Sequence, residues 1–327
     1  MPSSASPGGL RFPSSRVLLP RTRLAYVHLR NLLTDAKRDR AARISGYVAI
    51  SLPEELVTLY LLAGEVVNAT VRDADRACAM SIAEAIEQVP LEPEYGEICF
   101  NEADNEQLAC MFATQSVPPE PWPEGMTPSD PAALFPYLMS TTFDGVLEII
   151  ENENVNYLYF KNGTVARAFL ASAHHGTVVD RVAKLFGRGG RAGELRVTQW
   201  GVPAELPVQA PPALVQAYRD LAATLVKRLV DYGRESTPAI AEHARQSLLA
   251  SHPVLDGFSF TSGHVKEPLA DTPALTAGVA AWMREVMWAA VDHDVVSPDA
   301  LVREVTWDRR HMFQSAGLYD QIPWKVM

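Results

Sequence analysis

Cysteine is scarce in this chain, and its placement excludes two classes of small protein. The 327 residues hold three cysteines, Cys78, Cys99 and Cys110, an odd number with no Cys-x-x-Cys pair. Disulfide-rich secreted domains and zinc-ribbon modules need even numbers or paired spacings, so neither class fits. Cys99 and Cys110 lie in apolar runs that predict strands, which favours small buried side chains in a reducing compartment. We therefore expect a cytoplasmic protein.

The chain also lacks an excess of positive charge and any long apolar run. Its formal net charge is −10 at pH 7. Binding to nucleic acid without regard to sequence needs a basic surface, so nucleic acid is not an expected partner. No stretch reaches the ~18 consecutive apolar residues of a membrane helix, and the first residues lack the basic and apolar regions of a signal peptide. We expect no membrane span.

Motifs for common catalytic chemistry are missing as well. There is no Gly-x-Ser-x-Gly turn for a nucleophile. The glycine-rich stretch 187–193 lacks the Lys-Ser/Thr ending of a P-loop and precedes a predicted strand rather than a helix. His174-His175 lacks an apparent third metal ligand, and Asp292-His293-Asp294 follows a predicted apolar helix as a polar turn, where a cation such as His293 is favoured. We expect no enzyme activity, no catalytic residue, no metal site and no cofactor.

What the sequence does contain is a tandem repeat. The segment 45–69, which begins Ser-Gly-Tyr-Val-Ala-Ile, returns at 144–168 with the start Asp-Gly-Val-Leu-Glu-Ile. The two segments align without a gap at an offset of 99 residues (46 to 145). This offset joins Gly46 to Gly145, Gly64 to Gly163 and Ala69 to Ala168. Self-similarity at a fixed offset is typical of a supersecondary unit that was copied whole.

Each copy is predicted to contain a helix, three antiparallel strands, a second helix and a fourth strand. Asn162-Gly163 predicts a type I′ hairpin, because both residues tolerate positive φ. Strands are expected over 46–52, 56–62, 66–71 and 96–100 in the first copy, and over 145–150, 156–160, 165–170 and 193–197 in the second.

Helices of the repeated unit follow from the spacing of apolar residues. We expect helices over 24–33, 77–88 and 177–186. In the last of these, Val178, Val179, Val182 and Leu185 would face the sheet. Gly-Glu pairs at 96–97 and 193–194 place the last strands 97 residues apart (96 to 193), so the second helix region is predicted to absorb a small length change.

These signals predict an α+β fold with two tandem antiparallel-sheet-plus-helix units and an all-helical C-terminal domain. Proline-rich stretches separate the parts, and the start is rich in Pro, Ser and Arg. The predicted order is a flexible leader over 1–22, the first copy over 23–116, a linker over 117–131, the second copy over 132–202, a linker over 203–212 and the helical domain over 213–327.

The repeated unit resembles a known signalling domain. The order of its elements, the glycines that open a strand at Gly46 and Gly145, and the hairpin Leu-Tyr-Phe-x-Asn-Gly-x-Val-x-Arg-Ala at 158–168 resemble the PATAN domain. The resemblance covers both copies, about half of the chain, and leaves 213–327 unassigned. In the first copy Ala63-Gly64 replaces Asn-Gly. The family takes its name from the N-terminal region of a cyanobacterial response regulator.

The resemblance implies a non-enzymatic protein-interaction or regulatory module in bacterial signal transduction, with a protein signalling component as its partner. Two other functions stay open: a sensor that binds a small ligand or anion in the cleft between the copies, and a structural subunit of a larger assembly. Arg167, Arg188 and Arg191 are the candidate contacts to an anion or an acidic partner, because guanidinium groups beside a glycine-rich loop can hold an anion. The sequence leaves the oligomeric state undecided.

Overall fold

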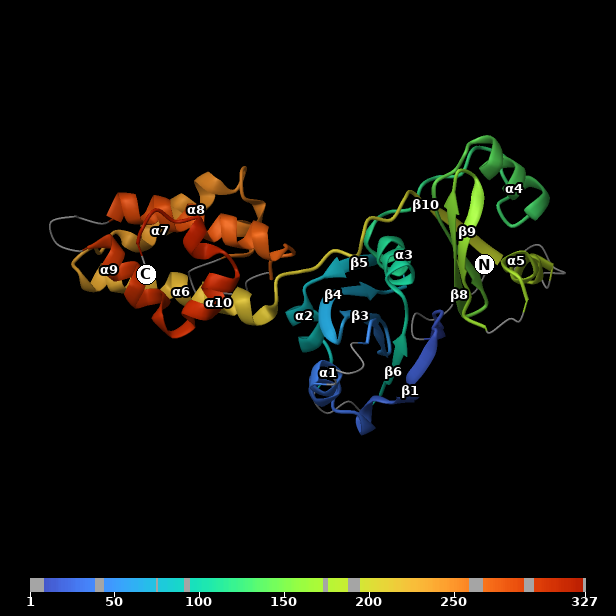
Figure 1. The fold of residues 1–327 in the computed structure, drawn as a ribbon, viewed down its shortest axis with the longest axis horizontal. Coiled ribbons are helices and arrows are strands. Elements are labelled where there is room, and N and C mark those ends of the chain that lie inside the picture. Colours follow the sequence, from blue (N-terminus) through green and yellow to red (C-terminus); the bar gives the residue numbers. More distant parts are fainter. Residues whose placement is uncertain are drawn as a thin grey trace. The chain divides into compact units, whose positions relative to one another are not determined.

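The protein has a mixed α+β fold with two antiparallel sheets (Figure 1). The computed structural model describes residues 9–38, 44–74, 76–90, 95–172, 176–187, 195–258, 267–290 and 297–325. The chain divides into two compact units. Unit 1 comprises residues 1–80 and 85–207, and unit 2 comprises residues 81–84 and 208–327.

The first sheet of unit 1 has six strands in the order β1-β6-β2-β3-β4-β5. They are β1 (Arg16–Arg23), β2 (Gly46–Ser51), β3 (Leu56–Leu62), β4 (Glu65–Arg72), β5 (Ala77–Met80) and β6 (Glu97–Glu102). Successive side chains point to opposite faces of a strand. Val48 and Leu59 accordingly share a core with helices α1 (Leu29–Arg38) and α2 (Ile82–Glu87), whereas Tyr47 and Tyr60 enter a second core on the other face.

The second sheet of unit 1 has four strands in the order β10-β7-β8-β9. They are β7 (Gly145–Glu151), β8 (Asn154–Lys161), β9 (Thr164–Phe169) and β10 (Leu195–Trp200). One face packs against helices α4 (Pro131–Ser140) and α5 (Val178–Gly187). Leu138, Leu147, Phe160 and Leu185 are buried in that core.

The pairing register of the second sheet reproduces that of the first at an offset of 99 residues. We call residues 29–102 repeat 1 and residues 131–200 repeat 2. Corresponding strand pairs join Gly46 to Leu61 and Gly145 to Phe160, and Ile50 to Ile98 and Ile149 to Val197. The offset of 99 therefore includes the last strand, where the Gly-Glu pairs predict 97. Gly193 and Glu194 lie outside the described residues.

Glycine is needed where each repeat opens its first strand. A Cβ atom on Gly46 would lie 2.1 Å from the carbonyl oxygen of Asn101, and one on Gly145 would lie 2.2 Å from that of Trp200. Real Cβ atoms do not approach backbone oxygens so closely. The neighbouring strand of each sheet thus passes through the space that a side chain would fill.

The hairpin between the second and third strands has the same backbone in both repeats. Asn162 and Gly163 have φ of 50° and 71°, which confirms the type I′ turn predicted there. Ala63 and Gly64 have φ of 51° and 83°. Ala63 thus holds a left-handed conformation that costs an alanine about 1 kcal/mol.

Helix α3 (Asn105–Ser116) contacts both sheets of unit 1. Its Leu108 and Met111 are buried in one core with Tyr47 of the first sheet and Tyr157 of the second. The Asp104 side chain caps the helix by accepting a hydrogen bond from the Gln107 N–H at 2.8 Å. Cys110 therefore lies in a helix, and the strand predicted around it is wrong, whereas Cys99 lies in β6 as predicted.

The described elements of residues 208–325 in unit 2 are helical. They are α6 (Pro212–Asp231), α7 (Thr237–Leu248), η3 (Pro253–Gly257), α8 (Thr272–Ala290), α9 (Pro298–Thr306), η4 (Trp307–Arg309), α10 (Arg310–Ser315) and η5 (Leu318–Asp320). Trp282 is buried in their core, and its indole N–H donates to the carbonyl of Ala241 at 2.9 Å. Across the described part of the chain, every helix is too short or too polar to cross a bilayer.

Two segments of the first repeat region differ from the predicted secondary structure. Residues 16–22, expected within a flexible leader, belong to β1, which pairs with β6; their Pro- and Arg-rich composition suits an exposed edge strand. Residues 77–80, expected as the start of a helix over 77–88, form β5 and pair with β4. Helix formation starts only after Ser81, whose hydroxyl accepts from the Glu84 N–H at 3.1 Å. Tertiary pairing thus overrides the helix propensity of Ala77 and Ala79.

Candidate interaction surface

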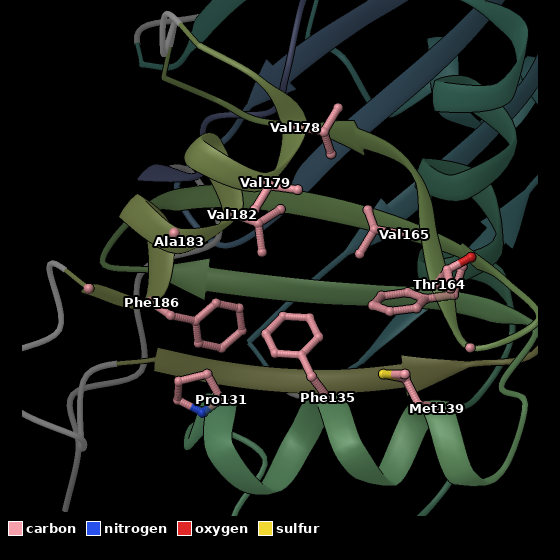
Figure 2. A pocket seen from close by; sticks show the side chains of 13 residues that line it. Pro131, Phe135, Met139, Thr164, Val165, Val178, Val179, Val182, Ala183 and Phe186 are labelled. Atoms are coloured by element: carbon pink, nitrogen blue, oxygen red, sulfur yellow. The ribbon is translucent and has the colours of Figure 1, made fainter.

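An apolar groove lies between helices α4 and α5 on the outer face of the second sheet. Its volume is about 690 Å³. Figure 2 shows side chains from both helices converging over the sheet, with Phe135 of α4 and Phe186 of α5 turned toward each other. Their ring centroids lie 5.5 Å apart in an edge-to-face arrangement. We call this feature the α4–α5 groove. It is lined by Pro131, Phe135, Met139, Phe160, Gly163, Thr164, Val165, Val178, Val179, Val182, Ala183, Phe186 and Gly187.

The groove exposes large apolar side chains at its rim. Val179 is 76% exposed, Met139 62% and Val178 38%. Single exposed apolar residues are ordinary, but several around one concave site mark a binding surface. Thr164 carries the single side-chain hydroxyl of the lining, so the groove offers dispersion contacts and almost no hydrogen bonds.

Helix α5 begins at a capping box that leaves its first two valines exposed. The Thr177 hydroxyl accepts from the Asp180 N–H at 3.2 Å, and Asp180 Oδ2 accepts from the Thr177 N–H at 3.1 Å. Hydrogen bonds from Thr177 lower the pKa of Asp180, so the box forms with the ionised carboxylate. Val182 and Leu185 face the sheet as predicted, but Val178 and Val179 lie one turn earlier, at the rim of the groove.

Strand β9 borders the groove and forms an edge of its sheet. In the part of the chain that the structure describes, β9 pairs with β8 on one side and with no strand on the other. Its counterpart in repeat 1, β4, pairs with β3 on one side and with β5 on the other. Thr164, Ala166 and Arg167 of β9 are exposed. An unpaired edge presents backbone N–H and C=O groups in a row that another strand can match.

Arg167, the first of the three candidate arginines, bridges repeat 2 to helix α3. Its Nη2 atom lies 2.6 Å from Asp104 Oδ2, and its Nη1 atom lies 3.1 Å from Glu106 Oε2. The guanidinium also lies 5.5 Å from the ring centroid of Phe169. An incoming anion would have to compete with two carboxylates for this side chain. Arg188 and Arg191 lie outside the described residues, as do His174, His175 and the segment 292–294.

A buried ion pair joins the two sheets of unit 1. Arg72 Nη1 of β4 lies 3.4 Å from Glu148 Oε1 of β7, and the two side chains are 16% and 3% exposed. Burial alone would lower the pKa of Arg72, but the Glu148 carboxylate together with Tyr157 and Tyr60 raises it. Arg72 therefore keeps its positive charge inside the protein. The pair stabilises the contact between the repeats only while both partners are present.

Further polar side chains close the space around this pair. Thr70 donates to Gln115 Oε1 of α3 at 2.8 Å, and the Tyr60 hydroxyl lies 3.3 Å from Thr70 Oγ1. Burial raises the pKa of Tyr60, which keeps its hydroxyl protonated. A separate pocket of about 370 Å³ is lined by residues of both repeats. Arg167 does not line this pocket, and Arg21, which does, forms an ion pair with Glu97.

The described residues offer little reactive chemistry. No group of three or more His, Cys, Asp or Glu side chains in the described ranges could hold a metal ion. Burial raises the pKa of Cys110 to about 12 and also raises that of Cys99, so both stay thiols at neutral pH. Both thiols are therefore suited to packing rather than to nucleophilic attack.

Comparisons with family models, with curated proteins and with solved structures found no significant match.

Sequence reasoning missed the α4–α5 groove and the open edge of β9. Two signals could have revealed them. Val178 and Val179 directly follow the cap Thr177, where a first turn is seldom buried. The cap residues Ser81 and Thr177 are 96 residues apart (81 to 177), whereas the strands are 99 apart, so the connection before α5 is shorter.

Proposed function

We propose that the chain is a non-enzymatic interaction module of bacterial signal transduction, built from two tandem PATAN-like units and an all-helical C-terminal domain. In this proposal it acts in the cytoplasm and binds a protein partner through the α4–α5 groove of repeat 2. The observation that supports the proposal is the groove itself, an apolar site of about 690 Å³ with exposed valine and methionine side chains at its rim.

The chemistry of the groove favours an apolar protein segment over a polar metabolite. A charged or hydroxylated ligand would lose hydrogen bonds to water and recover few from a lining whose side chains are apolar except for Thr164. Apolar anchors from a partner would instead bury the exposed faces of Met139, Val178 and Val179. A few well-buried apolar anchors can carry most of the binding free energy of an interface.

Site-directed photo-cross-linking in the native host tests this proposal. A photoreactive residue at position 179 is expected to capture one protein partner, and the same residue at Tyr95, which is 73% exposed in repeat 1, is expected to capture none. The variant Val179→Asp should abolish capture from a second groove position, Met139, because a carboxylate cannot enter the apolar site. Equal capture at positions 179 and 95, or no capture at 179, would refute a partner-binding groove.

The same variants serve as their own control for folding. Val179 is mostly exposed, so Val179→Asp should change the free energy of unfolding by less than about 0.5 kcal/mol. A loss of capture with an unchanged melting temperature therefore reports the groove and not the fold.

A further inference from the structure

Repeat 1 shows what covers the third strand of this fold when the edge is closed. Strand β5 pairs antiparallel with β4, with Ala69 opposite Met80, Val71 opposite Cys78 and Arg72 opposite Ala77. Met80 packs against the core that β3 shares with α1 and α2, so β5 also supplies an apolar side chain to the helix-covered face. The edge strand thus contributes both backbone pairing and side-chain packing.

The connection that contains β5 in repeat 1 is three residues shorter in repeat 2. In repeat 1, eight residues, 73–80, separate β4 from the cap Ser81 and include a turn and β5. Arg72 corresponds to Ala171 at the offset of 99, and only residues 172–176 separate Ala171 from the cap Thr177. Helix α5 is longer than α2, and this extra length restores the offset before β10. Among the described residues of repeat 2, no strand occupies the position that β5 takes beside β4 in repeat 1.

The open side of β9 keeps the features that let β4 accept a strand. The strand contains no proline. Both β4 and β9 have one irregularity near the hairpin, and β4 pairs with β5 beyond it. Residues Ala69 and Ala168 correspond, so a strand opposite Ala168 would point its side chain to the face that carries the α4–α5 groove, where Ala168 itself packs.

We propose that β9 accepts an extended segment of a protein partner as an added antiparallel strand that passes opposite Ala168, in the position that β5 occupies in repeat 1. The segment has small or medium apolar side chains like those of Ala77–Met80, no proline, and an apolar residue at alternate positions that enters the groove. The inference rests on the proposed function and specifies its partner: an extended apolar peptide rather than a helix. Strand addition supplies affinity through main-chain hydrogen bonds and specificity through the alternate side chains.

The direction of backbone N–H groups identifies a residue for the test. In repeat 1 the N–H of Asp73 donates to Arg76, across the turn toward β5. Alternation places the Ala69 N–H on the same side, where it donates to Asn68 Oδ1 at 2.8 Å. In repeat 2 Ala168 pairs with Leu158 in the register in which Ala69 pairs with Leu59, so the Ala168 N–H points away from β8 in the same way. Ala168→Pro removes a donor from the open side alone.

A synthetic peptide that copies residues 76–82, with alanine at position 78 to avoid oxidation, serves as the probe for the full chain. Fluorescence polarisation is expected to show binding with a Kd below about 1 mM, as befits one short strand. A peptide with proline at position 79 should not bind, and Ala168→Pro should weaken the first peptide at least tenfold. The proline peptide is tested on the unaltered protein, so the result does not depend on how the variant folds.

Three outcomes would overturn strand addition. The first is that the unaltered peptide does not bind, and the second is that the proline peptide binds equally well. The third is that the chain is already a dimer through β9, because a second copy would then be the occupant. Cross-linking from position 179 without peptide binding would support the groove as a partner site and refute only strand addition at β9. Peptide binding without cross-linking would support strand addition at β9 and refute the proposal that the groove binds a signalling partner.

Discussion

The two repeats of unit 1 share a strand register but differ at their edges. In repeat 1 the outer strands β6 and β4 are covered by β1 and β5, so that the sheet has six strands. In repeat 2 the corresponding strands β10 and β9 remain the outermost of four. Repeat 1 thus has a further strand outside each of these two, whereas in the described residues of repeat 2 no strand covers the outer side of β9, which borders the α4–α5 groove. The two repeats thus differ in the segments around a sheet whose strand register they share.

The contact between the repeats uses positions at which they differ. Arg72 of repeat 1 corresponds to Ala171, and Glu148 of repeat 2 corresponds to Ala49. Each charged residue of the buried pair thus replaces an alanine of the other copy. The ion pair therefore joins position 72 of repeat 1 to position 148 of repeat 2, whereas the reverse combination of positions, Ala171 and Ala49, carries no charge.

Removing one partner of the buried ion pair should have the largest effect on the free energy of unfolding. Arg72→Met leaves the Glu148 carboxylate buried without a cation, and we expect a loss of about 3–5 kcal/mol in the free energy of unfolding. The double variant Arg72→Met/Glu148→Leu should recover most of that loss, since it leaves no buried charge. Denaturant titration of the full chain measures both. A double variant as unstable as the single one would show that the cost lies in packing and not in charge.

Substitutions at Gly46 and Gly145, which open the first strand of each repeat, test whether the two repeats share one strand register. Gly46→Ala and Gly145→Ala would each place a Cβ atom against a backbone carbonyl oxygen, so both should lower the free energy of unfolding by about 2–3 kcal/mol. Gly187→Ala is the matched control, because nothing lies within 4 Å of its Cβ position. Urea denaturation compares the three variants. Tolerance at one of the two strand positions would contradict a common register.

The hairpin turns should give the smallest effect. Asn162→Ala should cost about 1 kcal/mol, because alanine is strained at a φ of 50°. Ala63→Asn should gain about 0.5 kcal/mol at the matching position of repeat 1, since Asn tolerates that conformation better. Thermal melts of both variants check the opposite signs. Shifts of the same sign would mean that side-chain contacts, and not the backbone, decide the two turns.

Local sequence patterns predicted the parts of the fold that local physics controls. Strand β3 matches its predicted span 56–62, and the Asn162-Gly163 turn follows from two residues that tolerate positive φ. Strand β5 and helix α3 could not be read in the same way. Ala77 pairs as a strand because β4 offers an edge, and the run around Cys110 is helical because Asp104 caps it and both sheets cover it.

The candidate surface was harder to predict than the fold, because it arises from a missing element. A pattern search finds Val178 and Val179 apolar and assigns them to the core, whereas the early start of α5 leaves them at the rim of the groove. The open edge of β9 appears only when the connections in the two repeats are compared in register. This second signal is not contained in any single stretch of residues.

Amide hydrogen exchange of the full chain without any added partner tests the comparison of the repeats most directly. Backbone amides in strand interiors exchange slowly when both sides of the strand are paired, and edge strands expose every second N–H. We predict strong protection over residues 65–72 and markedly faster exchange over residues 164–169, with the Ala168 amide among the fastest of its strand. Equal protection of the two segments would mean that the edge of β9 is already covered, and would contradict the account.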